Sequence, residues 1–436
     1  MLRVRSIVAG DDFADLRTTP YRLFFTSRTV SMLGDMMRPV VVVAAVVQAG
    51  YGATGVGFAL AAEMVPYALF VLFGGVLADR YSPRRMMIAA DVLRFVATGL
   101  LACAFAFGTP PLWHVLVLLG LTGLGSAAFQ PGVASVVPQV SADVLRGNAV
   151  LRMSESVMTV IGPAFAGVLL AVTDPWSGMV VDAITFAISA VCLWRLRLPG
   201  TATAKVSLRR GLGQGWHEFR SRGWLWGTIV VWMWGGLLCR GPSQTLGASF
   251  IVADRGATAY GVVMAIYGAG NAMGGFAALR HRPARPLVAG AVAVTTFAMS
   301  PLVVLCDLPT PWIALGFFVH GAGATFWLVL WHSTIQTHVP RAALSRVHSF
   351  DVAGSRVATP IGRALAGPAS ELMGLRPVLA VAVAAAVAVP AALLSLPALR
   401  AVRARPEDEE TTTESRLRAA PSAAESARSG RTTGPP

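Results

Sequence analysis

The chain has 436 residues, of which 55% are hydrophobic and only 13% are charged, and this balance excludes an ordinary soluble domain of that length. The formal net charge of +14 does not indicate a nucleic-acid-binding protein, because the arginines are spread between apolar runs instead of forming one basic face. The four cysteines lie inside apolar runs, where we expect small core residues and not a disulfide framework. The composition therefore predicts a polytopic membrane protein.

The apolar runs predict an all-α integral membrane protein with twelve transmembrane helices in two six-helix halves. Residues 1–21 form a polar segment in which no cleavable signal peptide is expected. The halves occupy residues 22–198 and 224–398, a linker with a short amphipathic stretch lies at 199–223, and a disordered tail is expected at 399–436. The predicted helices are 22–48, 56–73, 86–107, 113–137, 150–172, 177–198, 224–249, 258–279, 287–306, 312–337, 349–373 and 377–398.

A charged segment between the second and third predicted helices organises the N-terminal half. Residues 74–85 read GGVLADRYSPRR, and their apolar flanks make them a short loop at a membrane surface. Loops rich in Lys and Arg stay in the cytoplasm, which places this surface inside the cell. Asp79 can pair with Arg84 or Arg85 across the turn.

The chain also contains an internal repeat. A shift of 200 residues lays 274–285 on 74–85 with six of twelve positions identical, and lays 361–367 on 161–167 with five of seven identical. Two matches at one offset indicate two parallel halves. The second copy has Leu279 where the first has Asp79, so only the N-terminal loop keeps the carboxylate.

These motifs resemble those of the major facilitator superfamily. Residues 74–85 are similar to its loop between helices two and three, although Ser82 and Pro83 depart from the family pattern. The resemblance implies two pseudo-symmetric halves and a gating loop that stabilises one end state of alternating access by contacting the inner end of helix eleven. In this chain the gating residues are Gly75, Asp79, Arg80, Arg84 and Arg85.

Residues 161–167 read IGPAFAG and resemble the antiporter motif of helix five in the same superfamily. Gly162, Pro163 and Gly167 form its core, in which proline bends the helix and small residues permit close packing. Packing alone explains these residues equally simply. Together with 127–131 and 146–149, the motif is similar to the exporter branch that includes macrolide and siderophore efflux proteins.

The charge of the loops predicts the orientation. Nearly all Lys and Arg residues between the predicted helices fall on one side, with only Arg255 and Arg376 on the other. Both termini are therefore expected in the cytoplasm, in a multi-pass protein of the inner (plasma) membrane. We expect a monomer in the lipid bilayer, without nucleic-acid partners.

Ionisable residues inside membrane spans usually face a partner or a substrate path. Asp35 and Arg38 are spaced i, i+3 near the middle of their helix, so they either neutralise one another or couple transport to protons. Under the coupling hypothesis, Asp35 alternates between a protonated form and an ionised form that holds a cationic or polar substrate. Glu63 is a further coupling candidate, although Glu63 and Asp182 lie toward the outer ends, where solvated or snorkelling groups are the simpler interpretation.

The predicted substrate cavity involves the C-terminal half. Arg240 and Arg363 fall near the middle of their helices and are expected to shape the wall opposite Asp35. Trp234 and Trp327 sit deep enough to line an aromatic pocket, although tryptophan is also common at membrane interfaces. His320 has no metal-site spacing and is interpreted as a hydrogen-bonded interior residue.

The resemblance implies a proton-driven exporter of a small drug-like or secondary-metabolite molecule, with protons as the second transported species and without a cofactor or metal. Lipid flipping or solute uptake on the same scaffold are alternatives, because the fold does not fix the substrate. A non-transport membrane sensor or enzyme is the alternative of a different class. An enzyme requires a clustered nucleophile, metal set or acid–base pair, and the sequence shows none.

Overall fold

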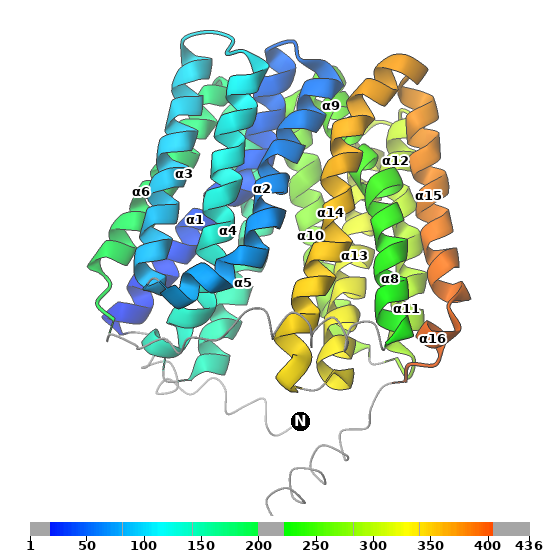
Figure 1. Ribbon diagram of the computed structural model, residues 1–436. Coiled ribbons are helices and arrows are strands. Elements are labelled where there is room, and N and C mark those ends of the chain that lie inside the picture. The colour runs from blue at the N-terminus through cyan, green and yellow to red at the C-terminus, as the bar shows by residue number, and fades with distance from the viewer. Residues whose placement is uncertain are drawn as a thin grey trace, which may run out of the picture.

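A computed structural model describes residues 18–80, 82–141, 143–198, 222–281, 283–339 and 341–403, with side chains except at 71–80, 134 and 341–356. The N-terminal segment, most of the predicted linker and the predicted tail lie outside the described residues. Twelve long helices run through the described part of the chain, and they form two groups of six that lie side by side (Figure 1). The predicted all-α architecture is confirmed.

The N-terminal group contains six continuous helices, and three of them begin at or next to a proline, whose fixed φ and missing N–H suit a first turn. They are α1 (Thr19–Gln48), α2 (Gly52–Arg80), α3 (Pro83–Ala106), α4 (Leu112–Val140), α5 (Val144–Val172) and α6 (Pro175–Arg195).

The C-terminal group also contains six spans, but two are interrupted by non-α turns. The first consists of α8 (Gly223–Gly235), a π-helical turn (Gly236–Arg240) and α9 (Gly241–Arg255), and the third of α11 (Pro286–Ala293), a 3-10 turn (Val294–Ala298) and α12 (Met299–Leu305). The others are α10 (Ala257–Arg280), α13 (Thr310–His338), α14 (Arg341–Met373) and α15 (Leu375–Ser395), followed by the short α16 (Pro397–Arg400).

The turn between α2 and α3 is shorter than the sequence predicts. We expected a loop over 74–85, but α2 continues to Arg80 and α3 begins at Pro83. Leucine, alanine and arginine are strong helix formers, so the charged segment extends α2 until proline forces a new start. The predicted starts at residues 150 and 349 are also too late, because α5 begins at Val144 and α14 at Arg341.

Ten helices in the described part of the chain are long and apolar enough to cross a membrane. The two further spans are the helix interrupted at Gly236–Arg240 and the charged α14. Interruptions of this kind are tolerated in membrane spans where other helices satisfy or cover the freed backbone groups.

The buried core is shared between the halves at only one end of the bundle. We call the end where the described chain starts and finishes the terminal end, and the opposite end, with the turns at Gly50, Gly108 and Gly374, the distal end (Figure 1). Toward the distal end, a single hydrophobic cluster joins residues of both halves, including Val43 and Ile251. Toward the terminal end, each half has its own cluster. Among the described side chains, the hydrophobic core is therefore shared by both halves distally and divided into one core per half at the terminal end.

Candidate functional site

A buried network of ion pairs lies inside the N-terminal half. At its centre Arg38 of α1 donates to three carboxylates on three helices. Its Nε lies 2.8 Å from Asp182 Oδ2 of α6, its Nη1 bonds to Glu63 of α2, and its Nη2 bonds to Asp35, one turn away on α1. A fully charged side chain is costly in a membrane-spanning segment, and these contacts provide its compensation.

A second arginine extends the network. Arg94 of α3 bonds through Nη2 to Asp91 and places Nη1 3.4 Å from Asp35 Oδ2, so Asp35 lies between Arg38 and Arg94. Asp91 also accepts a hydrogen bond of 2.5 Å from Ser189 of α6. Four carboxylates therefore share two guanidinium groups in this cluster, which we call the N-half cluster: Asp35, Arg38, Glu63, Asp91, Arg94 and Asp182.

Aromatic rings pack against both arginines of the cluster. The guanidinium carbon of Arg94 lies 4.3 Å from the ring centroid of Phe186 and 4.7 Å from that of Phe129. Arg38 stacks on the same Phe186 ring at 5.2 Å. Cation–π contacts of this kind gain strength where the cation is desolvated.

The members of the cluster differ in their access to the exterior. Asp91 and Asp182 are sealed, with side-chain exposures of 0% and 2%, whereas Asp35 is 18% exposed and Glu63 is 28% exposed. Asp35 and Glu63 are therefore the partly exposed carboxylates of the cluster.

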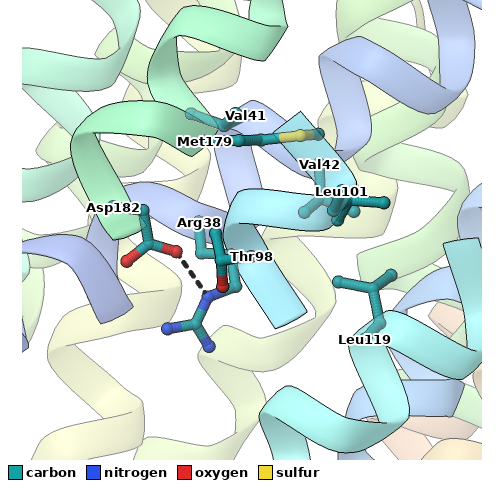
Figure 2. A pocket seen from close by; sticks show the side chains of 8 residues that line it. All are labelled: Arg38, Val41, Val42, Thr98, Leu101, Leu119, Met179 and Asp182. Atoms are coloured by element: carbon teal, nitrogen blue, oxygen red, sulfur yellow. Dashed lines mark hydrogen bonds and ion pairs between the residues drawn. The ribbon is translucent and has the colours of Figure 1, made fainter. Parts of the chain in front are cut away.

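A small cavity adjoins the buried ion pair of Arg38 and Asp182 (Figure 2). Its volume of about 10 Å³ is close to that of one water molecule. Thr98 Oγ1 and Asp182 Oδ1 have no hydrogen-bond partner among the described residues. The lining is polar only at Arg38, Thr98 and Asp182; the remaining residues are Val41, Val42, Leu101, Leu119 and Met179.

Close helix packing holds the cluster in place. A Cβ added to Gly34 of α1 would lie 2.2 Å from Asp182 Oδ1 and 2.3 Å from Thr185 Oγ1. Both distances are far below van der Waals contact, so only glycine allows α1 and α6 to approach this closely. The approach brings Asp182 within reach of Arg38, one helical turn further along α1.

The sequence interpretation did not connect Asp91, Arg94 or Asp182 with Asp35, and Asp182 is the clearest case. We expected it to be a solvated or snorkelling group, but its side chain is buried and paired with Arg38. A signal was present in α6, because Asp182, Thr185 and Ser189 recur at spacings of three and four residues and share one helix face. A polar stripe on an apolar helix indicates that its side chains join a buried network. The position of one residue along the helix does not give this information.

The predicted arginines of the C-terminal half lie close to each other. Arg363 of α14 donates to Gln244 Oε1 of α9 at 3.1 and 2.7 Å, and to the carbonyl oxygen of Leu60 in α2 at 3.0 Å. Arg363 lies within the electrostatic range of Glu63 and of Arg240. The side chain of Arg240 is exposed and forms no ion pair or hydrogen bond with a described residue.

The structure places neither predicted tryptophan at this site. Trp327 is 5% exposed and packs in the hydrophobic core of the C-terminal half against Trp232 and Trp331. Trp234 is 60% exposed and continues an exposed apolar stripe of α8 with Trp226, Val230 and Leu238. A stripe of this kind on a membrane helix faces lipid. Because α8 is apolar on every side, its sequence indicates how deep Trp234 lies in the membrane but not which way its side chain points.

The predicted packing motif of α5 contacts both halves. A Cβ added to Gly162 would lie 2.5 Å from Met36 Cβ of α1, and one added to Gly167 would lie 3.1 Å from Gly261 Cα of α10. The motif therefore lies where α5 meets α1 inside its own half and α10 across the interface. Pro163 is buried beside Gly162.

The predicted gating residues are described only in part. Arg84 bonds to the carbonyl oxygens of Leu193, at 2.8 Å, and of Trp194, at the end of α6. This contact stays inside the N-terminal half. The expected contact with the inner end of α14, the eleventh span, concerns side chains at 341–356 that lie outside the described residues. Arg85 is exposed, and the side chains of Gly75, Asp79 and Arg80 lie outside the described residues.

His320 in α13 occupies a separate buried site. Its Nδ1 lies 2.7 Å from Ser300 Oγ of α12, and its ring stacks on Phe297 with centroids 4.5 Å apart. This placement agrees with a hydrogen-bonded interior residue. Among the described residues, no group of three or more His, Cys, Asp or Glu side chains could hold a metal ion.

The sequence and fold match known transporters. The family model of the Major Facilitator Superfamily matches residues 24–362. An uncharacterized MFS-type transporter, y4rN of Sinorhizobium fredii, is 29% identical over 71% of this chain and 78% of its own length. The multidrug efflux pump Tap of Mycobacterium bovis is 24% identical over 79% of this chain and 86% of its own length. Macrolide efflux protein A of Enterococcus faecalis is 28% identical over 31% of this chain and 42% of its own.

Among solved structures, the nucleoside transporter NupG superimposes with a TM-score of 0.67. The match covers 86% of this chain and 98% of that one at 12% identity, which shows a shared fold and not a shared substrate.

Proposed function

Because the chain belongs to the major facilitator superfamily, whose members are membrane transporters and not enzymes, we propose that it exports a small drug-like molecule in exchange for protons. Similarity to a multidrug efflux pump and to a macrolide efflux protein supports export. Export of a bulky amphipathic molecule requires a substrate path between the two halves and a group that binds and releases protons.

The observation that carries this proposal is the charge of the N-half cluster. Four carboxylates share two arginines, so the cluster has an excess of two negative charges when every carboxyl group is ionised. Unpaired negative charge is costly in a membrane interior, and proton binding removes that cost. A cluster of this composition can therefore hold a proton in one state and lose it in another.

Asp35 and Glu63 are proposed as the groups that exchange protons, because they are the exposed members of the cluster. Arg38 contacts both of them and also the sealed Asp182, so a change at one carboxylate alters the hydrogen bonding available to the others. Glu63 is the member nearest to the second half, within electrostatic range of Arg363. Movement of the halves would change this neighbourhood and thereby the proton affinity of the cluster.

Alternating access is supported by the unequal packing of the two ends. The halves share one core distally, where Thr54 of α2 donates a hydrogen bond of 2.6 Å to Glu371 of α14. At the terminal end each half has its own core. We propose that the terminal end is cytoplasmic, which makes this an inward-facing state, and that Asp79 and the neighbouring arginines link the halves in the opposite state.

The test is transport by the purified protein reconstituted in liposomes with an imposed pH gradient. The first substrates form a panel of different charge, namely labelled erythromycin, the cationic dye ethidium and a drug-like carboxylate, since relatives include macrolide and multidrug efflux proteins. Asp35→Asn is expected to abolish accumulation driven by the gradient while downhill exchange continues, because the neutral side chain cannot cycle a proton. Asp174→Asn, at the start of α6, is the matched control, because it replaces an exposed carboxyl group outside the cluster.

If the Asp35→Asn variant still accumulates substrate against its gradient with an unchanged dependence on pH, Asp35 is only a structural partner of Arg38. The same transport test is then applied to Glu63→Gln. If both variants retain this accumulation, proton coupling through this cluster is refuted. Accumulation in the direction opposite to export would identify an uptake transporter on the same scaffold.

A further inference from the structure

The C-terminal half contains two membrane-embedded arginines, Arg240 and Arg363, that form no ion pair with a described carboxylate. Its described acidic side chains are Asp254, Asp307 and Glu371, and all three lie at distal helix ends. Asp254 and Asp307 pair with Arg255, and Glu371 accepts from Thr54. Buried or intramembrane charges are normally compensated by an opposite charge. Here only Arg363 lies within the electrostatic range of a carboxylate, Glu63 of the other half, so Arg240 calls for an explanation.

Backbone packing forces the two arginines together. A Cβ added to Gly241 would lie 2.6 Å from the carbonyl carbon of Gly362, and one added to Gly362 would lie 2.4 Å from the carbonyl oxygen of Leu237. The helices therefore cross in direct backbone contact at glycines. Arg240 precedes one of these glycines and Arg363 follows the other, so each guanidinium group lies in the field of the other.

The π-helical turn sets the position of Arg240. Gly236–Arg240 forms this turn directly before Gly241 and Pro242. Proline has no N–H to donate to the preceding turn, and the wider turn accommodates that loss. The π-helical turn also changes the direction in which the side chain of Arg240, its last residue, leaves the helix. Arg240 is in electrostatic range of His320 in α13 as well as of Arg363 in α14.

The two arginines differ in their contacts. Arg363 is occupied by neutral acceptors, the Gln244 amide oxygen and the Leu60 carbonyl oxygen. Arg240 is exposed and has no hydrogen bond or ion pair with any described residue. Its guanidinium donors are thus available, while Arg363 adds positive potential behind them.

We propose that Arg240, supported by Arg363, recognises an anionic group of the transported molecule. This inference rests on the proposed transport function and specifies its substrate class: a molecule with a carboxylate, sulfonate or phosphate. The planar guanidinium group matches such anions with two parallel hydrogen bonds. Binding of an anion would also relieve the repulsion between the two arginines, which a neutral or cationic molecule cannot do.

The experiment measures the thermal unfolding of the purified full-length protein in a neutral detergent during titration with 1-naphthoate. The uncharged analogue 1-naphthamide has the same ring system and controls for hydrophobic binding. We expect naphthoate to stabilise the protein at lower concentrations than naphthamide does. Arg240→Gln should weaken naphthoate binding about tenfold, the loss of one charged hydrogen-bonded contact, and leave naphthamide binding unchanged.

Two controls make the result specific. Arg376→Gln removes an exposed arginine at the distal end of the same half and should bind naphthoate as the unsubstituted protein does. Arg240→Lys keeps the charge and should retain part of the preference. Dioleoylphosphatidylglycerol is added in a separate arm, and complete loss of the naphthoate effect on its addition would identify a lipid headgroup as the occupant and overturn the substrate assignment.

Equal stabilisation by naphthoate and naphthamide, no stabilisation by either, or an unchanged preference in Arg240→Gln would each refute the inference. Failure of the two proposals is distinguishable, because this binding assay contains no pH gradient. A protein that prefers naphthoate through Arg240 but does not exchange protons would refute only proton-coupled export, and the reverse result would refute only the anion site.

Discussion

Replacement of Arg38 and of Asp182 should have unequal effects on stability, although the two side chains form one ion pair. Arg38→Gln leaves Asp182 and Glu63 without an ion-pair partner among the described residues, and leaves Asp35 only its longer contact to Arg94. Removing one partner of a buried pair typically costs about 3–5 kcal/mol, because the remaining charge is uncompensated. Here the removed cation serves three carboxylates.

Asp182→Asn changes the charge balance in the opposite direction. The amide oxygen still accepts from Arg38 Nε, so the loss is the difference between a charged and a neutral hydrogen bond, about 1 kcal/mol. The excess of negative charge in the N-half cluster falls from two to one, which offsets part of that loss. The structure therefore predicts that Arg38→Gln is at least three times as destabilising as Asp182→Asn.

The assay is thermal unfolding of the purified variants, followed by intrinsic tryptophan fluorescence in one detergent. Arg152→Gln is the control, because its side chain is 81% exposed and its pair with Glu155 contributes little. The double variant Arg38→Gln/Asp182→Asn should be more stable than Arg38→Gln alone. Equal destabilisation by the two single variants, or no recovery in the double variant, would refute the charge argument.

Four further predictions concern packing, gating and orientation. Gly34→Ala should lower the unfolding temperature, because its Cβ would overlap Asp182 Oδ1, whereas Gly99→Ala, with open space around its Cβ, should not. Gly261→Ala should separate α10 from Gly167 of α5 and reduce the distal cross-linking of cysteines placed at Thr54 and Glu371, while Gly275→Ala should leave it unchanged. Asp79→Asn should lower transport without affecting membrane insertion, and normal transport by a well-expressed variant would remove the gating role. Reporter fusions after Gly52, Gly108 and Asp307 should report the outside and fusions after Tyr81, Ser207 and Arg282 the cytoplasm; one reproducible reversal would overturn the orientation.

The helices were predictable because their signal is local. Apolar runs long enough for a bilayer, bounded by proline, glycine and arginine, located every span, although the end of α2 and the starts of α5 and α14 were misplaced. Errors occurred where charged residues continue a helix beyond the apolar run, as at Arg80 in α2 and at Arg341 in α14. A membrane span does not require its helix to end at the membrane surface.

The site was predictable only in part, because it depends on which face of each helix a side chain occupies. Asp35, Arg38 and Glu63 were identified as ionisable groups inside spans. Their contact with one another could not be predicted, because it depends on how α1 and α2 are oriented relative to each other. Trp234 and Trp327 show the opposite outcome, since both are deep but one faces outward and the other packs in a core. In helices that are apolar on every side, hydrophobic periodicity does not indicate which face points inward.

The two halves repeat in sequence and differ in charge, and this difference bears on the proposed coupling to protons. The N-terminal half concentrates four carboxylates around two arginines, whereas the described carboxylates of the C-terminal half lie only at distal helix ends, away from Arg240 and Arg363. Glu63 lies within electrostatic range of Arg363 at the boundary between these regions. A movement that separates the halves weakens this attraction and increases the uncompensated negative charge around Arg38. Proton uptake by the N-half cluster would then follow from the motion itself, without a dedicated relay between the halves.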